Sequence, residues 1–291
     1  DVKYVIFGIP EDVGVFANYG KMGASKAWEA TLKVLLNIQS NEFTKAKEVL
    51  ILGHLNFEEE LKEVSKLDQS KKKDVKKART LVEYIDAAVS NLVYQIVLAG
   101  KKPIIIGGGH NNSYGIIKGT SLALNSPVNI VNFDAHSDFR SEEGRHSGNG
   151  FSYAYSEGYL SNYFIFGLHE NYTSANVFKR LDRIKTINYN TFESLQVRKE
   201  LKFKKELKHA KDHIENLPFG IEIDCDAIRN IPSSAKTPSG FSIERAREFV
   251  HYFAKIENAR YLHVCEAAPS KKTSTQVGKL ITYLITDFIQ A

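Results

Sequence analysis

Six residues of the types that bind metal ions fall into three short clusters along the chain. Each cluster comes directly after a run of apolar and β-branched residues: PIII precedes GGGH, VNIVNF precedes DAHSD, and FGIEI precedes DCD. Four carboxylates and two imidazoles are enough donors to hold two divalent cations. The six residues are His110, Asp134, His136, Asp138, Asp224 and Asp226.

The spacing within the clusters favours a shared site. In an extended chain, side chains two residues apart lie on the same side. One side of DAHSD therefore presents all three of its ionisable residues, and Cys225 turns away between Asp224 and Asp226. Ligands of open α/β sheets bind beyond the carboxyl ends of the strands. We expect the three clusters to open onto one edge of a sheet.

Each cluster also has a structural explanation. A lone histidine after a glycine-rich turn, such as His110, is often a hydrogen-bonded structural residue, and Asp224 with Asp226 would serve equally well in caps or loops. DAHSD is the stronger signal, because three ionisable groups at a buried strand end repel and desolvate one another unless a cation compensates them. Together the clusters favour a metal centre.

The donor set also indicates the metal and the chemistry. Oxygen-rich ligation with two imidazoles favours Mn²⁺ over a thiolate-type zinc site. Two ions held about 3.5–4 Å apart can share and deprotonate a water molecule, which gives a hydroxide nucleophile at neutral pH. The reaction class that we expect is metal-assisted hydrolysis.

Short apolar runs alternate with longer amphipathic segments along the chain. Strands are expected at residues 3–8, 48–53, 103–107, 128–133, 162–167, 184–188, 219–224 and 260–265. Helices are expected at residues 25–37, 74–99, 113–124, 174–182, 193–213, 242–256 and 274–289. This alternation predicts the α/β class, with a mainly parallel sheet covered by helices on both faces. No linker or repeat interrupts it, so we expect one domain over residues 1–291.

Composition argues against several other classes. The net charge is +5, but most basic residues lie at 71–79 and 199–212, where interspersed acids and helical periodicity indicate solvated helix faces and not a nucleic-acid site. The longest apolar runs are strand-sized, and no signal-peptide pattern opens the chain. Two cysteines make no disulfide framework. We expect a cytoplasmic protein with a small-molecule substrate, and neither nucleic acid nor membrane as a partner.

The motifs resemble those of a known superfamily. GGGH, DAHSD and DCD, preceded by GIPEDVGVFANYGKMGASKAW at 8–28 and followed by CEAAP at 265–269, are similar to the ureohydrolases: arginases, agmatinases and formimidoylglutamases. The resemblance covers nearly the whole chain, and DAHxD with a later DxD is its most specific part. It implies a three-layer αβα fold with an about eight-stranded parallel sheet, two Mn²⁺ ions bound by the six residues above, and a homo-oligomer.

Departures from the arginase pattern indicate the substrate. GGGHNNSYG resembles the GGGHxxAYG form of formimidoylglutamases, and Phe151 in SGNGFS stands where arginases have a proton-transferring histidine. A phenyl ring carries no exchangeable proton, so arginase activity is not expected. DCD also continues without the acidic residue and proline typical of arginases and agmatinases. Glu222 replaces the serine usual before the first aspartate, and no role for it follows from the sequence.

The loop that leaves DAHSD carries two arginines, Arg140 and Arg145. Guanidinium groups bind carboxylates through paired hydrogen bonds. Formimidoylglutamate presents two carboxylates, whereas agmatine presents none, so we expect both arginines in the substrate site, with Arg145 the better candidate because it precedes the HSGxxF pattern. The open alternative is pairing with Glu142 or Glu143. The expected substrate-binding set is Arg140, Arg145, Ser147, Asn149 and Phe151.

Three residues are expected to act in catalysis. Asp138 would take a proton from the nucleophile and return it to the departing amine. Glu266 would pair with the cationic amidine and orient it, with capping of the next loop as the alternative. His146 is a candidate second proton carrier. His169 and Glu170 also follow a strand, but a structural role is the favoured interpretation for both.

Three functions stay open at this point. The first is a formimidoylglutamase-like hydrolase, which would release glutamate and formamide in histidine breakdown. The second is another amidine or guanidine hydrolase, acting on a guanidino acid, agmatine or arginine. The third is a metal-binding homologue without catalysis, supported only by Glu222 and Phe151. The GGGH motif, the arginine-bearing loop and the missing proline favour the first.

Overall fold

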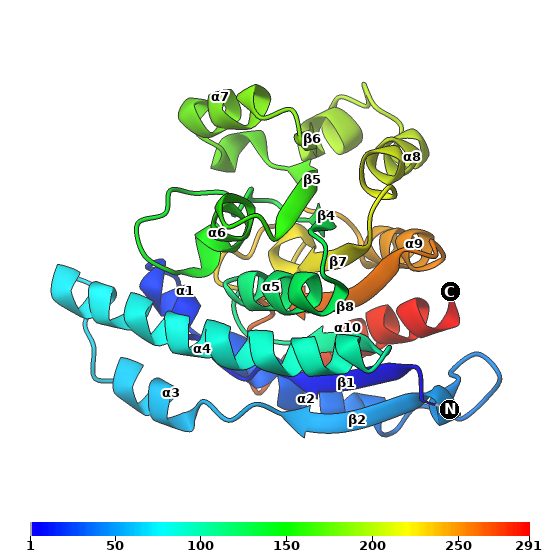
Figure 1. Ribbon diagram of the computed structural model, residues 1–291, viewed down its shortest axis with the longest axis horizontal. Coiled ribbons are helices and arrows are strands. Elements are labelled where there is room, and N and C mark those ends of the chain that lie inside the picture. The colour runs from blue at the N-terminus through cyan, green and yellow to red at the C-terminus, as the bar shows by residue number, and fades with distance from the viewer. Residues whose placement is uncertain (1) are drawn as a thin grey trace.

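The computed structural model describes residues 2–291, and its centre is one sheet of eight strands in the order β2-β1-β3-β8-β7-β4-β5-β6 (Figure 1). All neighbouring strands pair in parallel. The strands are β1 (Tyr4–Gly8), β2 (Val49–His54), β3 (Lys102–Ile106), β4 (Val128–Phe133), β5 (Leu160–Leu168), β6 (Ile187–Thr191), β7 (Phe219–Asp224) and β8 (Ala259–Cys265). Each expected strand is present, although the one expected at 184–188 lies at 187–191.

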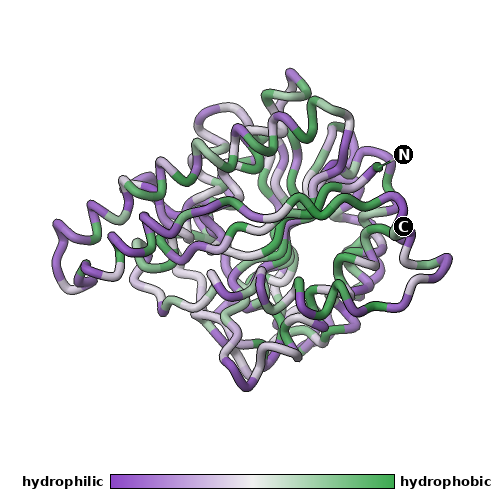
Figure 2. The backbone as a smooth tube through the Cα atoms, turned by 90° about the horizontal axis from the view of Figure 1, so that it is seen from below, coloured by the Kyte–Doolittle hydropathy of each residue, from purple (hydrophilic) through white to green (hydrophobic). Residues whose placement is uncertain are grey.

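Helices cover both faces of this sheet, as parallel strands joined by crossovers require. They are α1 (Val13–Ala17), α2 (Ala27–Leu35), α3 (Glu58–Val64), α4 (Lys72–Leu98), α5 (Asn112–Leu124), α6 (Gly150–Ser156), α7 (Ala175–Arg183), α8 (Phe203–Ile214), α9 (Ile243–Ala254) and α10 (Ser274–Gln290). Figure 2 shows the hydrophobic segments of the chain gathered along the central strands, with hydrophilic segments toward the outside.

Consecutive residues of the central strands pack into two separate cores. Ile104 and Ile106 lie in a core with residues of α2, α8, α9 and α10. Ile105 points the other way, into a core with residues of α1, α4, α5 and α6. This alternation follows from the pleat of a strand. The layers are therefore helix, sheet and helix, and the expected αβα fold class is confirmed.

Helix α4 is long and apolar enough to cross a membrane by length and composition alone. Its buried residues, among them Val82, Ile85 and Val89, belong to the core that α4 shares with α5. Tyr84 on the same helix is 66% exposed, so the helix has one buried and one solvated side. That is the pattern of a helix covering a sheet.

The single helix expected at 193–213 is wrong. Residues Glu193–Val197 form a short π-helix, and α8 begins only at Phe203. Lys199, between the two, has a φ angle of 57°. A left-handed residue ends a right-handed helix. Helices α1, α3 and α6 were not expected, because segments of 5, 7 and 7 residues are too short for a helical period to stand out.

The sheet order places the three motif-bearing strands close together. Strands β8 and β7 lie between β3 and β4, so the carboxyl ends of all four strands meet at one edge. GGGH follows β3, DAHSD follows β4, and DCD begins with the last residue of β7. The predicted common edge is therefore confirmed.

Candidate metal centre

The six metal-type residues form two overlapping groups at this edge. His110, Asp134, Asp138 and Asp224 form one group, and Asp134, His136 and Asp226 form the other. Within each group the donor atoms lie within 4.8 Å of one another. Asp134 belongs to both groups, so its two carboxylate oxygens face two neighbouring positions.

The distances in the first group suit one shared cation. His110 Nδ1 lies 2.8 Å from Asp138 Oδ2 and 3.2 Å from Asp224 Oδ2. It lies 3.3 Å from Asp134 Oδ2. In octahedral coordination with metal–donor distances of about 2.1 Å, neighbouring donors lie about 3.0 Å apart. The four donors therefore have the separations that a small divalent cation among them requires.

The second group is slightly more open. His136 Nδ1 lies 3.2 Å from Asp226 Oδ2 and 3.7 Å from Asp134 Oδ1. His136 is also the most exposed member of the six, with 29% of its side chain accessible, and the ring of Tyr172 stacks on it at 5.4 Å between centroids. This second position faces the cavity described below.

Burial provides a test of whether a cation fits. Nδ1 of His110 and Oδ1 of Asp226 are buried and have no hydrogen-bond partner among the described residues. His110 and Asp134 are fully buried. Burying charged or polar atoms without partners costs several kcal/mol, and a divalent cation would compensate each of them. The donor set therefore fits two cations of the oxygen- and imidazole-binding type.

Local hydrogen bonds aim these carboxylates. Asp134 Oδ1 accepts the backbone N–H of His136 at 2.7 Å, and Oδ2 accepts the side-chain amide of Asn132 at 2.9 Å. Asp224 Oδ1 accepts the backbone N–H of Asp226 at 2.8 Å. In both motifs the first aspartate thus closes a turn with one oxygen and leaves another donor for the site. The cap role considered for DCD is therefore present, and it leaves Oδ2 of Asp224 available for a cation.

Two residues at the site have left-handed backbone conformations. Asp138 has a φ angle of 43° and Glu266 one of 60°. Each such conformation of a residue other than glycine costs on the order of 1–3 kcal/mol, and such residues cluster at functional sites. Both left-handed residues lie at the edge of the sheet, beside the two donor groups.

A cavity of about 440 Å³ opens above the two groups. Its floor includes His136, Asp138, Asp224, Asp226 and Glu266. The wall residues used below are Asn18, Arg140, Ser147, Tyr172 and Ser234. A cavity of this size suits a small molecule.

Glu266 lies where the sequence predicts it, beside the metal-type residues. Its Oε1 accepts the backbone N–H of His110 at 2.9 Å, and its Oε2 accepts the hydroxyl of Ser234 at 3.2 Å. Burial, together with the charges of Asp226 and Asp138, raises the pKa of Glu266, and the N–H of His110 opposes this rise. A cationic group entering the cavity would compensate this carboxylate.

Arg140 lies on the cavity wall with half of its side chain exposed. Its Nη1 donates to Asn18 Oδ1 at 2.6 Å, and the amide of Asn18 donates to Ser147 Oγ at 3.1 Å. The nearest oxygen of Glu143 is 3.8 Å away. The pairing with Glu143 considered from the sequence is thus present as a long, half-exposed ion pair, and Asn18 Oδ1 is the hydrogen-bond acceptor of this guanidinium among the described residues.

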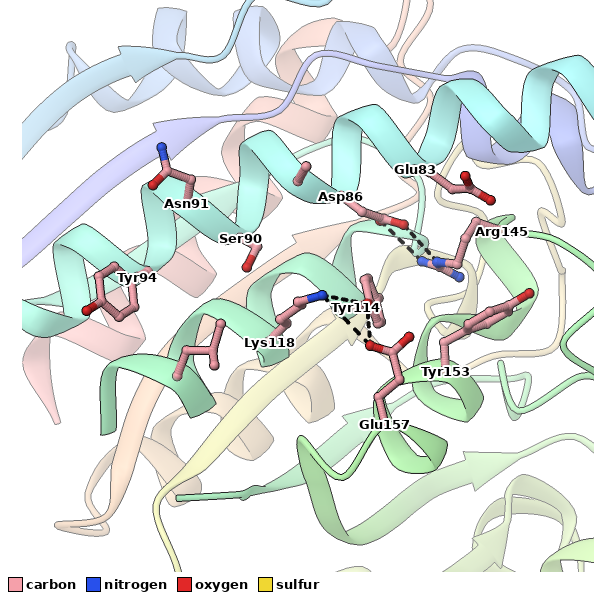
Figure 3. A pocket seen from close by; sticks show the side chains of 12 residues that line it. Glu83, Asp86, Ser90, Asn91, Tyr94, Tyr114, Lys118, Arg145, Tyr153 and Glu157 are labelled. Atoms are coloured by element: carbon pink, nitrogen blue, oxygen red, sulfur yellow. Dashed lines mark hydrogen bonds and ion pairs between the residues drawn. The ribbon is translucent and has the colours of Figure 1, made fainter. Parts of the chain in front are cut away.

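Arg145, the arginine preferred from the sequence, does not reach this cavity. It is 3% exposed, and its Nε and Nη2 donate to the carboxylate of Asp86 at 2.8 and 3.3 Å. Its Nη2 also donates to the carbonyl of Asn111 at 2.9 Å, and the guanidinium stacks on Tyr114 and Tyr153. It lines a separate cavity of about 570 Å³ between α4, α5 and α6 (Figure 3). The ion pair with Asp86 on α4 directs the Arg145 guanidinium away from the cavity above the two donor groups.

His146 and Asn149 lie inside the loop and not on the cavity. Nδ1 of the fully buried His146 accepts the N–H of Gly148 at 3.1 Å. Burial, assisted by neighbouring arginines, lowers the pKa of His146 to about 3, so its ring is neutral. The Asn149 amide donates to the carbonyls of Ser141 and Gly144 at 3.2 and 2.9 Å. The structure thus gives both residues a loop-stabilising position.

Phe151 is fully buried and packs edge-on against the imidazole of His110 at 5.1 Å. It also stacks on Tyr163 at 4.5 Å. It therefore supports a metal-type residue from behind and does not touch the cavity. Glu170 pairs with Arg198 at 2.6 Å on the surface, which agrees with its expected structural role.

Sequence reasoning missed Asn18 and Ser234 as cavity residues. Asn18 follows α1, a helix that was not expected, and its only signal is its place in the GIPEDVGVFANYG stretch. Ser234 lies in the irregular segment after DCD. Neither residue type stands out without the fold around it.

Comparison with known proteins agrees with the motifs. The sequence model of the arginase family matches residues 2–290. The formimidoylglutamase of Hahella chejuensis is 28% identical over 189 residues, which cover 62% of this chain and 51% of that relative. The formimidoylglutamase of Streptococcus pyogenes serotype M12 is 23% identical over 295 residues, covering 97% of this chain and 84% of the relative. The chain thus spans about half of the first relative and most of the second.

Solved structures show the same fold. The crystal structure of Trypanosoma cruzi formiminoglutamase with Mn²⁺ has a TM-score of 0.77 at 19% identity, covering 100% of this chain and 94% of that one. Formimidoylglutamase from Bacillus subtilis has a TM-score of 0.74 at 19% identity, covering 99% and 87%. At these identities the likeness concerns the fold alone.

Proposed function

The chain belongs to the arginase family, and we propose that it hydrolyses N-formimidoyl-L-glutamate to glutamate and formamide. Membership makes it a hydrolase of linear amidines. The observation that supports the substrate is the half-exposed guanidinium of Arg140 on the wall of the cavity above the two donor groups. A guanidinium at this place favours a substrate with carboxylates and repels the doubly cationic agmatine.

We propose one Mn²⁺ ion in each donor group, with Asp134 shared between them. Bound there, the ions would supply a hydroxide nucleophile at neutral pH. Asp134 suits the shared position because its Oδ2 faces His110 and its Oδ1 faces His136.

Glu266 binds and orients the reacting group in this proposal. The formimidoyl group is cationic when protonated, and the Glu266 carboxylate on the cavity floor is its natural partner. Two donors, His110 N–H and Ser234 O–H, fix that carboxylate. Fixing the amidine in one orientation above the floor accounts for several kcal/mol of barrier reduction in reactions of this kind.

Asp138 carries the proton. It lines the cavity, and its Oδ2 is 2.8 Å from His110 Nδ1. The departing glutamate amine must gain a proton as the C–N bond breaks, and a carboxyl group at the cavity floor can deliver it. His146, fully buried beside Gly148, lies outside the cavity lining, so Asp138 takes this role alone.

Arg140 binds the substrate carboxylates with help from Ser147. Arg140 uses Nη1 for Asn18, which leaves further N–H groups for a carboxylate. Ser147 is tied to the same Asn18 and lines the same wall. Arg145, Asn149 and Phe151 stabilise the loop and the metal-type residues from outside the cavity.

The experiment compares substrates that differ in one feature. Mn²⁺-loaded protein is incubated with formimidoylglutamate, with formimidoylglycine, which has only one carboxylate, and with arginine, agmatine and a guanidino acid. Formamide and urea are then measured. The proposal expects formamide from formimidoylglutamate at the highest kcat/KM and much less from formimidoylglycine. Urea from any guanidine substrate at a higher kcat/KM would overturn the assignment.

A further inference from the structure

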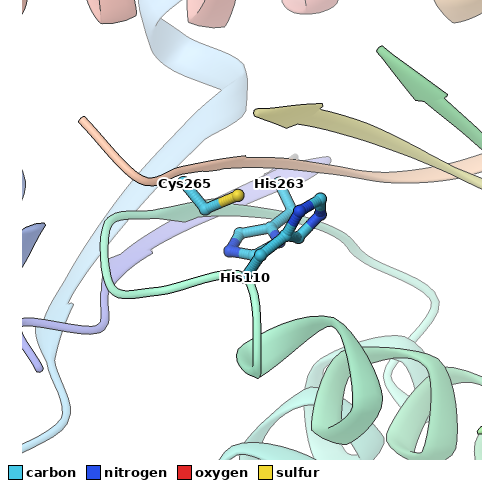
Figure 4. A group of neighbouring side chains, drawn as sticks. All are labelled: His110, His263 and Cys265. Atoms are coloured by element: carbon cyan, nitrogen blue, oxygen red, sulfur yellow. The ribbon is translucent and has the colours of Figure 1, made fainter. Parts of the chain in front are cut away.

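A fully buried polar cluster lies behind His110, on the side away from the cavity. It consists of Glu222 on β7 and of Tyr261 and His263 on β8, and all three are 0% exposed. Figure 4 shows the imidazole of His263 next to that of His110, with the thiol of Cys265 beside them. The two imidazole centroids are 6.0 Å apart.

The register of the sheet creates this cluster. Glu222 and His263 are direct partners in the pairing of β7 with β8, and Gly220 is the partner of Tyr261. Partners in neighbouring strands point to the same face, so all the side chains gather on one side. A Cβ atom on Gly220 would lie only 2.1 Å from the Tyr261 ring. Glycine at 220 therefore lets the tyrosine lean over the strand toward Glu222.

Two side chains hold the Glu222 carboxylate. The hydroxyl of Tyr261 donates to Oε1 at 2.6 Å, and Nδ1 of His263 lies 2.5 Å from Oε2. These two contacts fix the direction of the buried carboxylate, and Oε2 is the oxygen that lies on the side of His110.

His110 lies between Glu222 and the two donor groups. Its Nδ1 faces Asp134, Asp138 and Asp224, whereas its Nε2 faces Glu222 Oε2 at 3.5 Å. Among the residues that the structure describes, Nε2 has no hydrogen-bond partner. A histidine that binds a cation through Nδ1 carries its proton on Nε2, and a carboxylate behind the ring fixes that tautomer and makes the ring a stronger donor.

We propose that Glu222 is a positioning residue for the metal centre, which aims Nδ1 of His110 at the first cation and strengthens its binding. His263 and Tyr261 hold Glu222 in place. This inference rests on the proposed function only insofar as His110 is a metal ligand. It also gives a role to the glutamate for which the sequence offered none.

The test measures metal affinity in four variants, of which Glu222→Asp is the conservative one. Glu222→Gln keeps the shape and removes the charge, and Tyr261→Phe removes one donor to Glu222 while keeping the ring. Glu206→Gln is the matched control, because Glu206 is a buried carboxylate on α8 bonded to Asn190, outside both donor groups. Mn²⁺ is titrated into metal-free protein by calorimetry, and unfolding temperatures are recorded with and without Mn²⁺.

We expect Glu222→Gln to weaken Mn²⁺ binding about 10- to 100-fold, the range for residues behind a metal ligand. Tyr261→Phe should weaken it less, and Glu206→Gln should leave it unchanged. Glu222→Asp keeps the charge but should bind Mn²⁺ more weakly than the wild type, because its shorter side chain lies farther from His110. Should Glu222→Gln fail to fold, Tyr261→Phe decides alone, and wild-type affinity in it would refute the inference.

The outcomes separate this inference from the proposed function. Weaker Mn²⁺ binding in Glu222→Gln supports it even if the wild-type protein releases no formamide from formimidoylglutamate. Formamide release by the wild type together with unchanged Mn²⁺ affinity in Glu222→Gln overturns it and leaves the function standing.

Discussion

Arg140 and Arg145 lie five residues apart in one loop, and the structure predicts opposite consequences of losing them. Replacement by methionine keeps the apolar stem of each and removes the guanidinium. Arg140 is half-exposed on the cavity wall, whereas Arg145 is 3% exposed and paired with Asp86. Arg140→Met should therefore damage catalysis, and Arg145→Met should damage stability.

The magnitudes follow from these environments. A hydrogen bond to a charged partner contributes about 1.5–3 kcal/mol, so losing the carboxylate contact should lower kcat/KM for formimidoylglutamate about 10- to 150-fold. Exposed ion pairs contribute about 0–1 kcal/mol to folding, so the unfolding temperature of Arg140→Met should hardly change.

For Arg145→Met, Asp86 would stay buried without its partner. Breaking a buried pair costs about 3–5 kcal/mol, which corresponds to a fall of roughly 6–20 °C in unfolding temperature. Burial raises the pKa of Asp86 to about 6 even beside Arg145. Since protonation neutralises the orphaned carboxyl group, the loss should be smaller at pH 5 than at pH 8.

Two measurements check these effects. Steady-state kinetics are recorded with formimidoylglutamate and formimidoylglycine, and thermal unfolding is recorded at pH 5 and pH 8. The two variants control for each other, because they remove the same group from the same loop. An Arg145→Met protein with normal stability and a raised KM, or an Arg140→Met protein with unchanged kinetics, would show that these two roles are assigned wrongly.

Three further predictions rest on other parts of the molecule. Chelation should lower the unfolding temperature and Mn²⁺ should restore it, since a cation at a hundred times its Kd contributes about 2.7 kcal/mol; an unchanged temperature would speak against a bound metal. Because burial lowers the pKa of His146 to about 3 in the folded state, this histidine takes up a proton in the unfolded state at a higher pH than in the folded state. Stability should thus fall by up to about 1.4 kcal/mol per pH unit below pH 6.5, and urea unfolding of His146→Gln should show a flatter pH dependence than the wild type. Gly220→Ala should cost about 1–3 kcal/mol in urea unfolding, because its Cβ would overlap Tyr261; a neutral effect would show that the ring can move.

The gathering of the six metal-type residues at one edge of the sheet was predictable, because their signal is local. Each cluster directly follows a buried strand, and the period of two within DAHSD places its ionisable residues on one side. Parallel topology then brings the strand ends together whatever the details of the loops. The fold class was predictable for the same reason, since the alternation of strands and helices follows from local hydrophobic patterns in the sequence.

The direction of Arg145 was not predictable, because it depends on Asp86, a residue 59 positions earlier on α4. The environment of Glu222 likewise depends on His263 and Tyr261, which only the β7–β8 register brings beside it. The break near Lys199 depends on one left-handed residue inside an otherwise helical pattern. In each case the deciding contact is between segments far apart in the sequence, or is a single backbone angle.

A two-metal amidine hydrolase is tested best by measuring formamide release from formimidoylglutamate by Mn²⁺-loaded wild-type protein and by Asp134→Asn. Asp134 is the one residue shared by both donor groups. We expect two Mn²⁺ ions per chain and formamide release in the wild type, with both lost in Asp134→Asn. Formamide release by Asp134→Asn at the wild-type rate would contradict this expectation.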